Sequence, residues 1–167
     1  MKTIIAILYA HLVKRRNKKW INSPIKWQTN TFKKLIKSGE KTEFGKNHDF
    51  ENIESYEQYK EKVPIRDYEE LRPYIEKVVN GEIDILWPGK PLYFAKTSGT
   101  TSGAKYIPIT KESIKTHIRS ARDALLNYFL KTKNFKPLNG KHMFLQGSPE
   151  LDKKQGIYHG RLSGISA

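Results

Sequence analysis

The sequence contains no cysteine, which excludes disulfide bonds and metal sites with cysteine ligands. It also lacks an apolar run close to the about 20 residues that cross a bilayer as a helix, so we expect no transmembrane span. The apolar stretch 4–13 continues directly into the basic run 14–19, without the small-residue cleavage site of a secretory signal. From these absences we expect a cytoplasmic protein.

Acidic residues are few compared with basic ones. The 167 residues include 17 Asp and Glu against 31 Lys and Arg, which gives a formal net charge of +14. Such an excess makes nucleic acid a candidate partner. However, the lysines are scattered among Glu and Asp as on solvated helix faces, and no nucleic-acid-binding motif accompanies the dense basic run. A basic module for nucleic acid or an anionic membrane stays as the alternative from another class, with nucleic acid not favoured.

Apolar residues make up 37% of the chain, and their spacing predicts mainly helices in its first half. Residues 41–53 are polar and read as irregular structure around Gly45. Pro73 lies inside one expected helix and predicts its division into two short turns. The expected helices are 3–13, 25–38 closed by Gly39, one opened by Ser55 and stopped by Pro64, and one opened by Asp67 and ended by Asn80-Gly81.

Three short segments rich in aromatic and apolar residues, 92–96, 106–109 and 142–146, predict strands. Residues 82–87 read as extended as well. A long helix capped by Thr110 separates the second strand from the third. Its apolar residues recur at steps of four and three, which is helical spacing, and they are Ile114, Ile118, Ala121, Leu125 and Tyr128.

Between the first two expected strands, seven consecutive residues are all hydroxyl residues or glycines. The hydroxyls can donate hydrogen bonds to phosphate oxygens, and the glycines allow positive φ and close backbone approach. Successive N–H groups in such a turn also form an anion-binding concavity. We therefore predict a polyphosphate site with the candidate residues Thr97, Ser98, Gly99, Thr100, Thr101, Ser102, Gly103 and Lys105.

This loop is not a Walker A motif, which needs four residues between its glycines and a Lys-Ser/Thr pair directly after the second one. Here three residues separate Gly99 from Gly103, and Ala104 precedes Lys105. The competing interpretation is that a Ser/Thr/Gly cluster between strands is only a turn. Composition alone leaves these two interpretations open.

The order of the motifs favours the phosphate site. The S-G-T-T sequence followed by a lysine resembles the signature loop of the acyl-adenylating (ANL) superfamily. The wider segment VPIRDYEELRPYIEKVVNGEIDILWPGKPLYFAKTSGTTSGAKYIPIT, together with TEFGKNHDF and ESYEQYKEKVPI, resembles the acyl-acid amido synthetases of the auxin-responsive (Gretchen Hagen) family. The resemblance covers roughly residues 20–167 and looks closest to the bacterial branch. Plant members often differ in the spacing between the second glycine and the lysine.

The resemblance implies an α/β fold, the N-terminal portion of the large domain of an acyl-adenylating enzyme, with helices leading into an incomplete mixed sheet. Residues 1–20 would form an N-terminal basic helix and 21–167 part of an adenylation domain. The rest of that domain and a C-terminal domain would lie outside this chain. We therefore expect little or no activity from these 167 residues alone.

The resemblance also implies a reaction. ATP with Mg²⁺ would activate a small carboxylic acid as an acyl-adenylate, and an amino acid or another amine would then form the amide. An acyl-CoA ligase of the same superfamily is the alternative within the enzyme class. The chain offers no metal ligands near the loop by sequence. His159 and Gly160, in a glycine-rich segment, are candidate substrate-binding residues.

Overall fold

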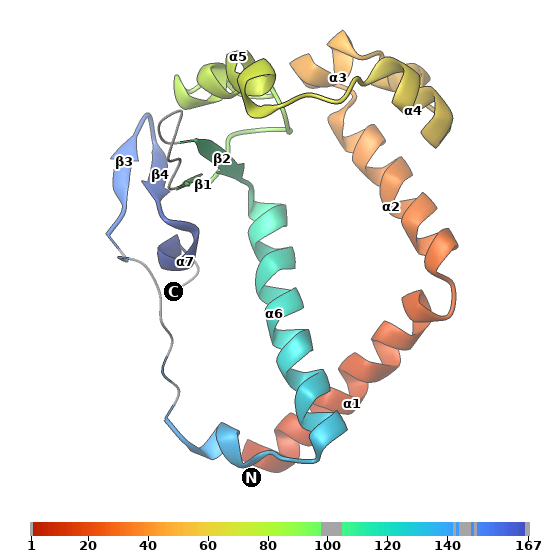
Figure 1. Ribbon diagram of the computed structural model, residues 1–167, viewed down its shortest axis with the longest axis vertical. Helices are drawn as coiled ribbons and strands as arrows, with labels where there is room; N and C mark the ends of the chain where they lie inside the picture. Colours follow the sequence, from red (N-terminus) through yellow and green to blue (C-terminus); the bar gives the residue numbers. More distant parts are fainter. Residues whose placement is uncertain (1, 98–104, 142, 144–147, 149, 166–167) are drawn as a thin grey trace. The chain divides into compact units, whose positions relative to one another are not determined.

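The computed structural model of the protein describes residues 2–97, 105–141, 143, 148 and 150–165 (Figure 1). These residues belong to two compact units, one made of 1–28 with 112–145 and the other of 29–111 with 146–167. None of the described helices has the length and apolar character needed to cross a membrane. The elements are α1 Lys2–Ile21, α2 Pro24–Gly39, α3 Glu43–Asn47, η1 Phe50–Asn52, α4 Tyr56–Lys62, α5 Tyr68–Val79, β1 Tyr93–Lys96, β2 Tyr106–Ile109, α6 Lys111–Thr132, η2 Lys136–Asn139, β3 Asp152–Lys154, β4 Ile157–Gly160 and α7 Leu162–Ile165.

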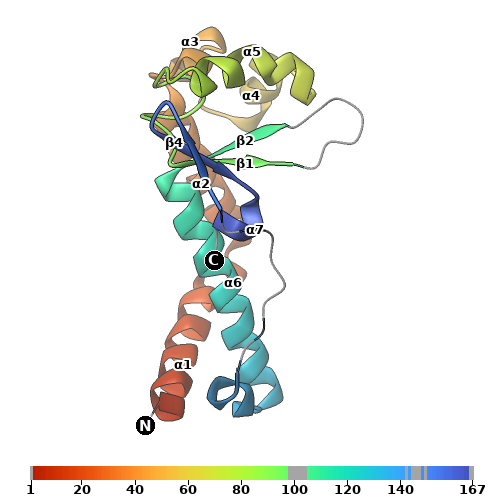
Figure 2. The ribbon, with the colours of Figure 1, turned by 90° about the vertical axis from the view of Figure 1, so that its left-hand side faces the viewer.

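In the first unit, α1 packs against α6 (Figure 2). Ala10 and Val13 of α1 are buried together with Leu126 of α6, and Leu130 packs against them. Burial of apolar side chains is the main favourable term in such a contact, at about 25 cal/mol per Å² of apolar surface removed from water. The two helices are therefore held together chiefly by this small apolar cluster.

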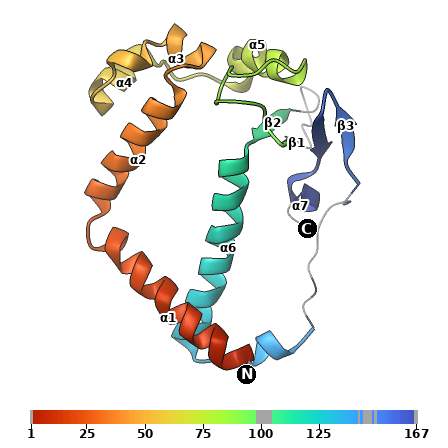
Figure 3. The ribbon, with the colours of Figure 1, turned by 180° about the vertical axis from the view of Figure 1, so that it is seen from behind.

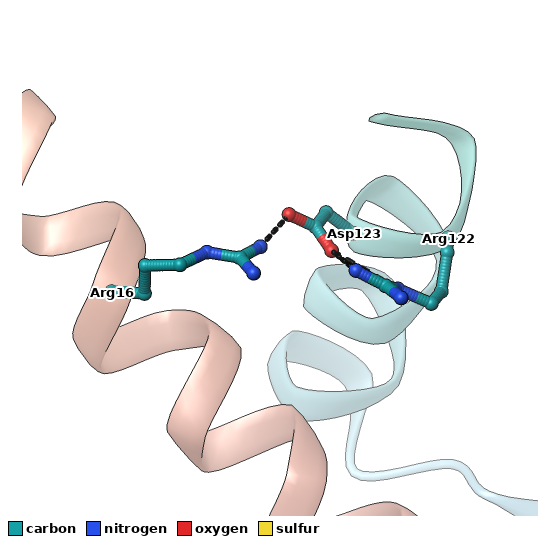
Figure 4. A network of polar contacts seen from close by, with 3 residues as sticks. All are labelled: Arg16, Arg122 and Asp123. Atoms are coloured by element: carbon teal, nitrogen blue, oxygen red, sulfur yellow. Dashed lines mark hydrogen bonds and ion pairs between the residues drawn. The ribbon is translucent and has the colours of Figure 1, made fainter. Parts of the chain in front are cut away.

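A polar contact lies beside the cluster. Figure 4 shows the carboxylate of Asp123 between Arg16 of α1 and Arg122 of α6, with an ion pair to each. Both arginine side chains are more than 40% exposed, and exposed ion pairs contribute only about 0–1 kcal/mol. The Arg16–Asp123 pair, which is the one that joins the two helices, therefore adds little to their stability beyond the apolar cluster.

The structure contains both helices predicted in this unit, and the first is longer than the apolar periodicity over 3–13 indicates. The expected helix 3–13 runs on to Ile21 through the basic run 14–19, because lysine and arginine are good helix formers. The long helix is confirmed and begins directly after Thr110.

The stripe predicted for α6 is not its buried face. Ile118 and Leu125 are 54% and 45% exposed, whereas Leu126 and Phe129 are buried. Helical spacing identifies a helix, but which of its residues are buried depends on where the neighbouring helix packs. Here α1 covers the side of α6 next to the predicted stripe.

In the second unit, α2, α4 and α5 confirm three predicted helices. The α4 and α5 helices both begin with a capping box, from Ser55 with Gln58 and from Asp67 with Glu70. The prediction that Pro73 divides α5 is wrong, because the helix is continuous across it. Proline removes one N–H from the helical ladder, and burial of the following apolar face at Ile75 and Val78 offsets that loss.

The prediction of irregular structure for 41–53 is also wrong, because this segment holds α3 and η1. Thr42 is the N-cap of α3: its hydroxyl donates to the Gly39 carbonyl (2.6 Å) and accepts from the Gly45 N–H (3.0 Å). A Cβ on Gly45 would lie 2.0 Å from the Gly39 carbonyl oxygen. Gly45 is therefore required where the start of α3 passes the end of α2.

Residues 82–87 were expected to be extended, but they form a series of bends and belong to no described strand. The carbonyls of Asp84 and Ile85 accept the first two N–H groups of α3, from Glu43 (2.8 Å) and Phe44 (3.0 Å). This satisfies donors that a helix N-terminus leaves without intrahelical partners. The segment thus caps a helix rather than extending the sheet.

The described strands form one mixed sheet in the order β2-β1-β4-β3. Strand β1 pairs antiparallel with β2 and parallel with β4, and β3 pairs antiparallel with β4. Figure 3 shows β2 and β3 on opposite sides of β1. The expected α/β fold with a mixed sheet is therefore confirmed. Its core consists of Val78, Ile85, Phe94 and Ile157.

The sequence reading missed the β3–β4 hairpin. Its turn residues Gln155 and Gly156 have φ values of 49° and 77°, the left-handed pair that a two-residue hairpin turn requires. The expected strands 92–96 and 106–109 are confirmed as β1 and β2. The expected strand 142–146 lies outside the described residues except for Met143.

Candidate functional site

The predicted phosphate loop connects β1 to β2. Lys96 and Tyr106 are the last paired residues of the two strands. Next to this pair, on the loop side, the Thr97 N–H donates to the Lys105 carbonyl (3.0 Å). This bond closes the hairpin at the points where the loop leaves and rejoins the sheet. Of the candidate residues, Thr97 and Lys105 are described, and Ser98, Gly99, Thr100, Thr101, Ser102 and Gly103 lie outside the described residues.

Lys105 is held by an aromatic ring at the start of α5. Its ammonium lies 5.2 Å from the centroid of Tyr68, within the range of a cation–π contact. The Tyr68 hydroxyl also accepts the N–H of Tyr106, the first residue of β2, at 2.8 Å. The Tyr68 side chain therefore contacts both Lys105 and Tyr106, the two neighbouring residues at the end of the loop.

A second cation lies at the loop's entrance. Lys96, the last residue of β1, forms a 3.3 Å ion pair with Asp152 of β3. Among the described residues, no three His, Asp or Glu side chains converge in a way that would hold a metal ion. The described part of the loop thus has a lysine at each end, Lys96 with a carboxylate partner and Lys105 against an aromatic ring.

His159 belongs to strand β4, and only 2% of its surface is exposed. Its ring centroid lies 5.1 Å from that of Phe94 and 5.6 Å from that of Tyr106. No described group forms a hydrogen bond with either ring nitrogen. Burial lowers the pKa of His159 below its ordinary value, and the positive charges of Lys96 and Lys154 lower it further, against a smaller opposing effect of Asp152. The ring is therefore neutral at neutral pH.

Gly160 follows in the same strand and packs closely. A Cβ at this position would lie 2.4 Å from a methyl carbon of Leu151. The strand backbone therefore lies very close to the Leu151 side chain. The assignment of His159 and Gly160 to substrate binding stays a prediction. The geometry gives them two defined properties, a neutral imidazole with no described polar partner and a glycine packed against the end of the Leu151 side chain.

The state of His159 leads to a pH prediction. Because its pKa is lowered on folding, the unfolded chain binds the proton more readily, and stability falls as pH decreases through the unfolded value of about 6.5. We expect His159→Leu to reduce this loss and, by removing unpaired buried nitrogens, to raise the free energy of unfolding at pH 8 by about 1 kcal/mol. Unfolding measured between pH 5 and 8 checks this, with exposed His117→Leu as the control. An unchanged pH dependence in His159→Leu would contradict it.

Sequence reasoning missed Tyr68 and Lys96 as parts of the site. A signal for Tyr68 exists in hindsight, because Asp67 with Glu70 predicts a helix start and therefore places Tyr68 in the first turn. Nothing in the sequence alone shows that this turn lies against the hairpin. That contact requires the tertiary structure.

By fold, the chain is the class of α/β domain found at the start of acyl acid amido synthetases. It matches the solved structure of the GH3.15 acyl acid amido synthetase with a TM-score of 0.79 over 91% of this chain and 28% of that one, at 19% identity. The family model described as the GH3 family N-terminal domain matches residues 13–167. The chain belongs to the GH3 family.

Curated relatives are similar over shorter parts of their length. The chain is 28% identical to a jasmonoyl–L-amino acid synthetase, GH3.5 of Oryza sativa subsp. japonica, over 78% of this chain and 22% of the relative. It is 25% identical to an indole-3-acetic acid-amido synthetase, GH3.2 of Arabidopsis thaliana, over 81% and 22%. It is 34% identical to a 4-substituted benzoates–glutamate ligase, GH3.12 of Arabidopsis thaliana, over 47% and 14%. Each match spans less than a quarter of the relative.

Proposed function

We propose that the intact protein is an ATP-dependent acid–amino acid ligase of the acyl-adenylating type. The observation that carries the proposal is the β1–β2 hairpin, which closes between Thr97 and Lys105 around the hydroxyl- and glycine-rich sequence. Membership of the GH3 family supports it, since relatives of this chain are named as amido synthetases and ligases. The family expected from the sequence is thus confirmed, and its chemistry is proposed for this protein.

In this proposal the hairpin loop holds the polyphosphate of ATP. Strand pairing on both sides fixes the two ends of the loop. Lys105 supplies positive charge at the exit, and hydroxyl and backbone N–H groups supply donors to phosphate oxygens. Bound Mg²⁺ would neutralise phosphate charge, with protein ligands from outside these 167 residues.

The reaction that fits such a site has two steps. A carboxylate oxygen attacks the α-phosphorus of ATP, the bond to the bridging oxygen breaks, and pyrophosphate leaves. The amine nitrogen of an amino acid then attacks the acyl carbon, AMP leaves, and the nitrogen loses a proton. The first step replaces a poor leaving group on the acyl carbon, the carboxylate oxygen, by a good one, AMP. The loop would act in this step by positioning the phosphates and by stabilising their charge.

The substrates proposed are a small carboxylic acid and an amino acid. The relatives are named for jasmonate, indole-3-acetate and substituted benzoates as acids, and one is named for glutamate as the amine partner. We therefore propose a panel of aryl, indolyl and alkyl carboxylic acids as the first set to test. Replacing the amino acid by CoA in the second step separates an amide synthetase from an acyl-CoA ligase.

The first prediction for this function is carboxylate-dependent exchange of labelled pyrophosphate into ATP by the intact protein. Exchange should require an acid from the panel, because pyrophosphate is released only when the acyl-adenylate forms. Omitting the acid is the control. Absence of exchange across the whole panel would overturn the proposed function. The 167-residue chain alone is expected to show little or no exchange.

A further inference from the structure

The first turn of α5 is fixed by a reciprocal pair of bonds. The Glu70 N–H donates to the Asp67 carboxylate (2.9 Å), and the Asp67 N–H donates to the Glu70 carboxylate (2.9 Å). Tyr68 follows the N-cap directly and is the first residue of the helix. A capping box of this kind defines the start of a helix and the direction in which the chain enters it. Tyr68 therefore projects from a well-defined backbone position.

Tyr68 makes two separate contacts with the exit of the loop. Its hydroxyl accepts the N–H of Tyr106 at 2.8 Å. Because β2 is at an edge of the described sheet, this bond gives that N–H a partner outside the strands. Its ring receives the ammonium of Lys105 at 5.2 Å from the centroid. One contact fixes the backbone and the other restricts the side chain.

Two cations, Lys105 and Arg72, lie near the Tyr68 ring, and they differ in whether a carboxylate pairs with them. The guanidinium of Arg72 also lies over the ring, at 5.9 Å from the centroid, but it forms a 2.7 Å ion pair with Glu69. Within the described part of the chain, Lys105 has no carboxylate partner. A cation–π contact at a partly exposed site is worth about 0.5–1 kcal/mol, less than a charge-assisted bond to phosphate. The ring holds the ammonium in place without neutralising it.

We propose that Tyr68 is a positioning residue for the nucleotide site, acting through Lys105. Its hydroxyl holds the start of β2, and its ring keeps the Lys105 ammonium at the exit of the loop, ready to bind the polyphosphate of ATP. This inference rests on the proposed function in that it takes ATP as the ligand.

The test compares Tyr68→Leu, Tyr68→Phe, Lys105→Ala and the double variant Tyr68→Leu/Lys105→Ala in the intact protein. ATP affinity is measured by titration calorimetry. Tyr68→Leu should weaken ATP binding about two- to five-fold, the value of one cation–π contact. It should have no further effect when Lys105 is already alanine. Tyr68→Phe keeps the ring and removes only the bond to the Tyr106 N–H, so it should weaken ATP binding less than Tyr68→Leu does.

Tyr56→Leu is a matched control. Tyr56 is likewise the first residue of a helix with a capping box, and Lys60 lies 5.4 Å from its ring centroid, but it has no described contact with the hairpin. This variant should leave ATP affinity unchanged. If Tyr68→Leu weakens binding equally with and without Lys105, or if Tyr56→Leu has the same effect, Tyr68 acts through general structure and the inference is overturned.

The hydroxyl is tested separately by amide hydrogen exchange at Tyr106, which needs no activity. Exchange should be faster in both Tyr68→Phe and Tyr68→Leu, and unchanged protection would overturn this half of the proposal. ATP binding without pyrophosphate exchange would refute the proposed function while still testing Tyr68. Failure of the wild type to bind ATP would overturn both.

Discussion

Replacing Thr100, Thr101 and Lys105 together with alanine in the intact protein is expected to slow acyl-adenylate formation by about 10³-fold. Removing a single preorganised donor to a developing charge costs about 10²–10³ in rate, and this change removes two hydroxyls and one cation from the proposed polyphosphate site. The acid should bind nearly as well as before, because these side chains are assigned to ATP. Pyrophosphate exchange measures the rate, and titration of the acid measures its affinity.

A control with the same chemistry is available on α6. Thr116, Lys131 and Thr132 provide two hydroxyls and one ammonium on exposed helix positions. Their joint replacement by alanine should leave the exchange rate close to that of the wild type. A normal rate in the loop variant would refute the phosphate-loop assignment. Acid affinity that falls in parallel with the rate would place the loop at the acid instead of at ATP.

Gly45→Ala is expected to destabilise the protein by about 3 kcal/mol, at the upper end of what overpacking costs. The added methyl would lie 2.0 Å from the Gly39 carbonyl oxygen and 2.8 Å from its carbon. These are backbone atoms, so the crossing of α2 and α3 must open. The same movement would pull apart the hydroxyl bridge from Thr42 to both glycines. The expected result is a fall of roughly 6–12 °C in the unfolding midpoint for a domain of this size.

Gly140→Ala tests whether the effect comes from the contact or from the loss of a glycine. Gly140 has an ordinary φ of −91°, and a Cβ there would approach only the Pro137 carbonyl oxygen, at 3.6 Å. This variant should unfold within about 0.5 kcal/mol of the wild type. Equal midpoints for Gly45→Ala and the wild type would show that the crossing is looser than described. An equally large loss of stability in Gly140→Ala would show that the effect does not come from the Gly39 contact, because the loss of a glycine by itself restricts the unfolded chain and stabilises the folded one.

The helices of this protein were predictable where local signals determine them. Ser55 and Asp67 satisfy their own helix starts through side chains three residues ahead, and this pattern is visible in sequence. The start of α3 has a local cap in Thr42, but its first two N–H groups donate to the distant carbonyls of Asp84 and Ile85. No local pattern can reveal such a partner. The same limit explains why the apolar spacing of α6 identifies the helix but does not show which of its residues α1 covers.

The candidate site likewise combines local features, which the sequence predicts, with contacts between distant segments, which it does not. The hairpin strands and the composition of the loop between them are local features, and both strands are confirmed. The side chain that holds Lys105 comes from Tyr68, far away in sequence, and was missed. The central strand β4 was missed as well, because IYHG is short and glycine-punctuated and its pairing partner β1 lies far back in the chain. The family resemblance pointed to the loop, but not to Tyr68, whose side chain contacts the end of the loop.

The sheet order affects how the protein is made. Tyr93 of β1 pairs with Ile109 on one side and with Tyr158 on the other. A ribosome adding about 5–20 residues per second therefore leaves the second edge of β1 open for about 3–13 seconds after that strand has emerged. During this interval Phe94 lacks Ile157 as a core neighbour, and the open edge can pair with another nascent chain. A pause in translation within α6 should make this polypeptide more dependent on chaperones.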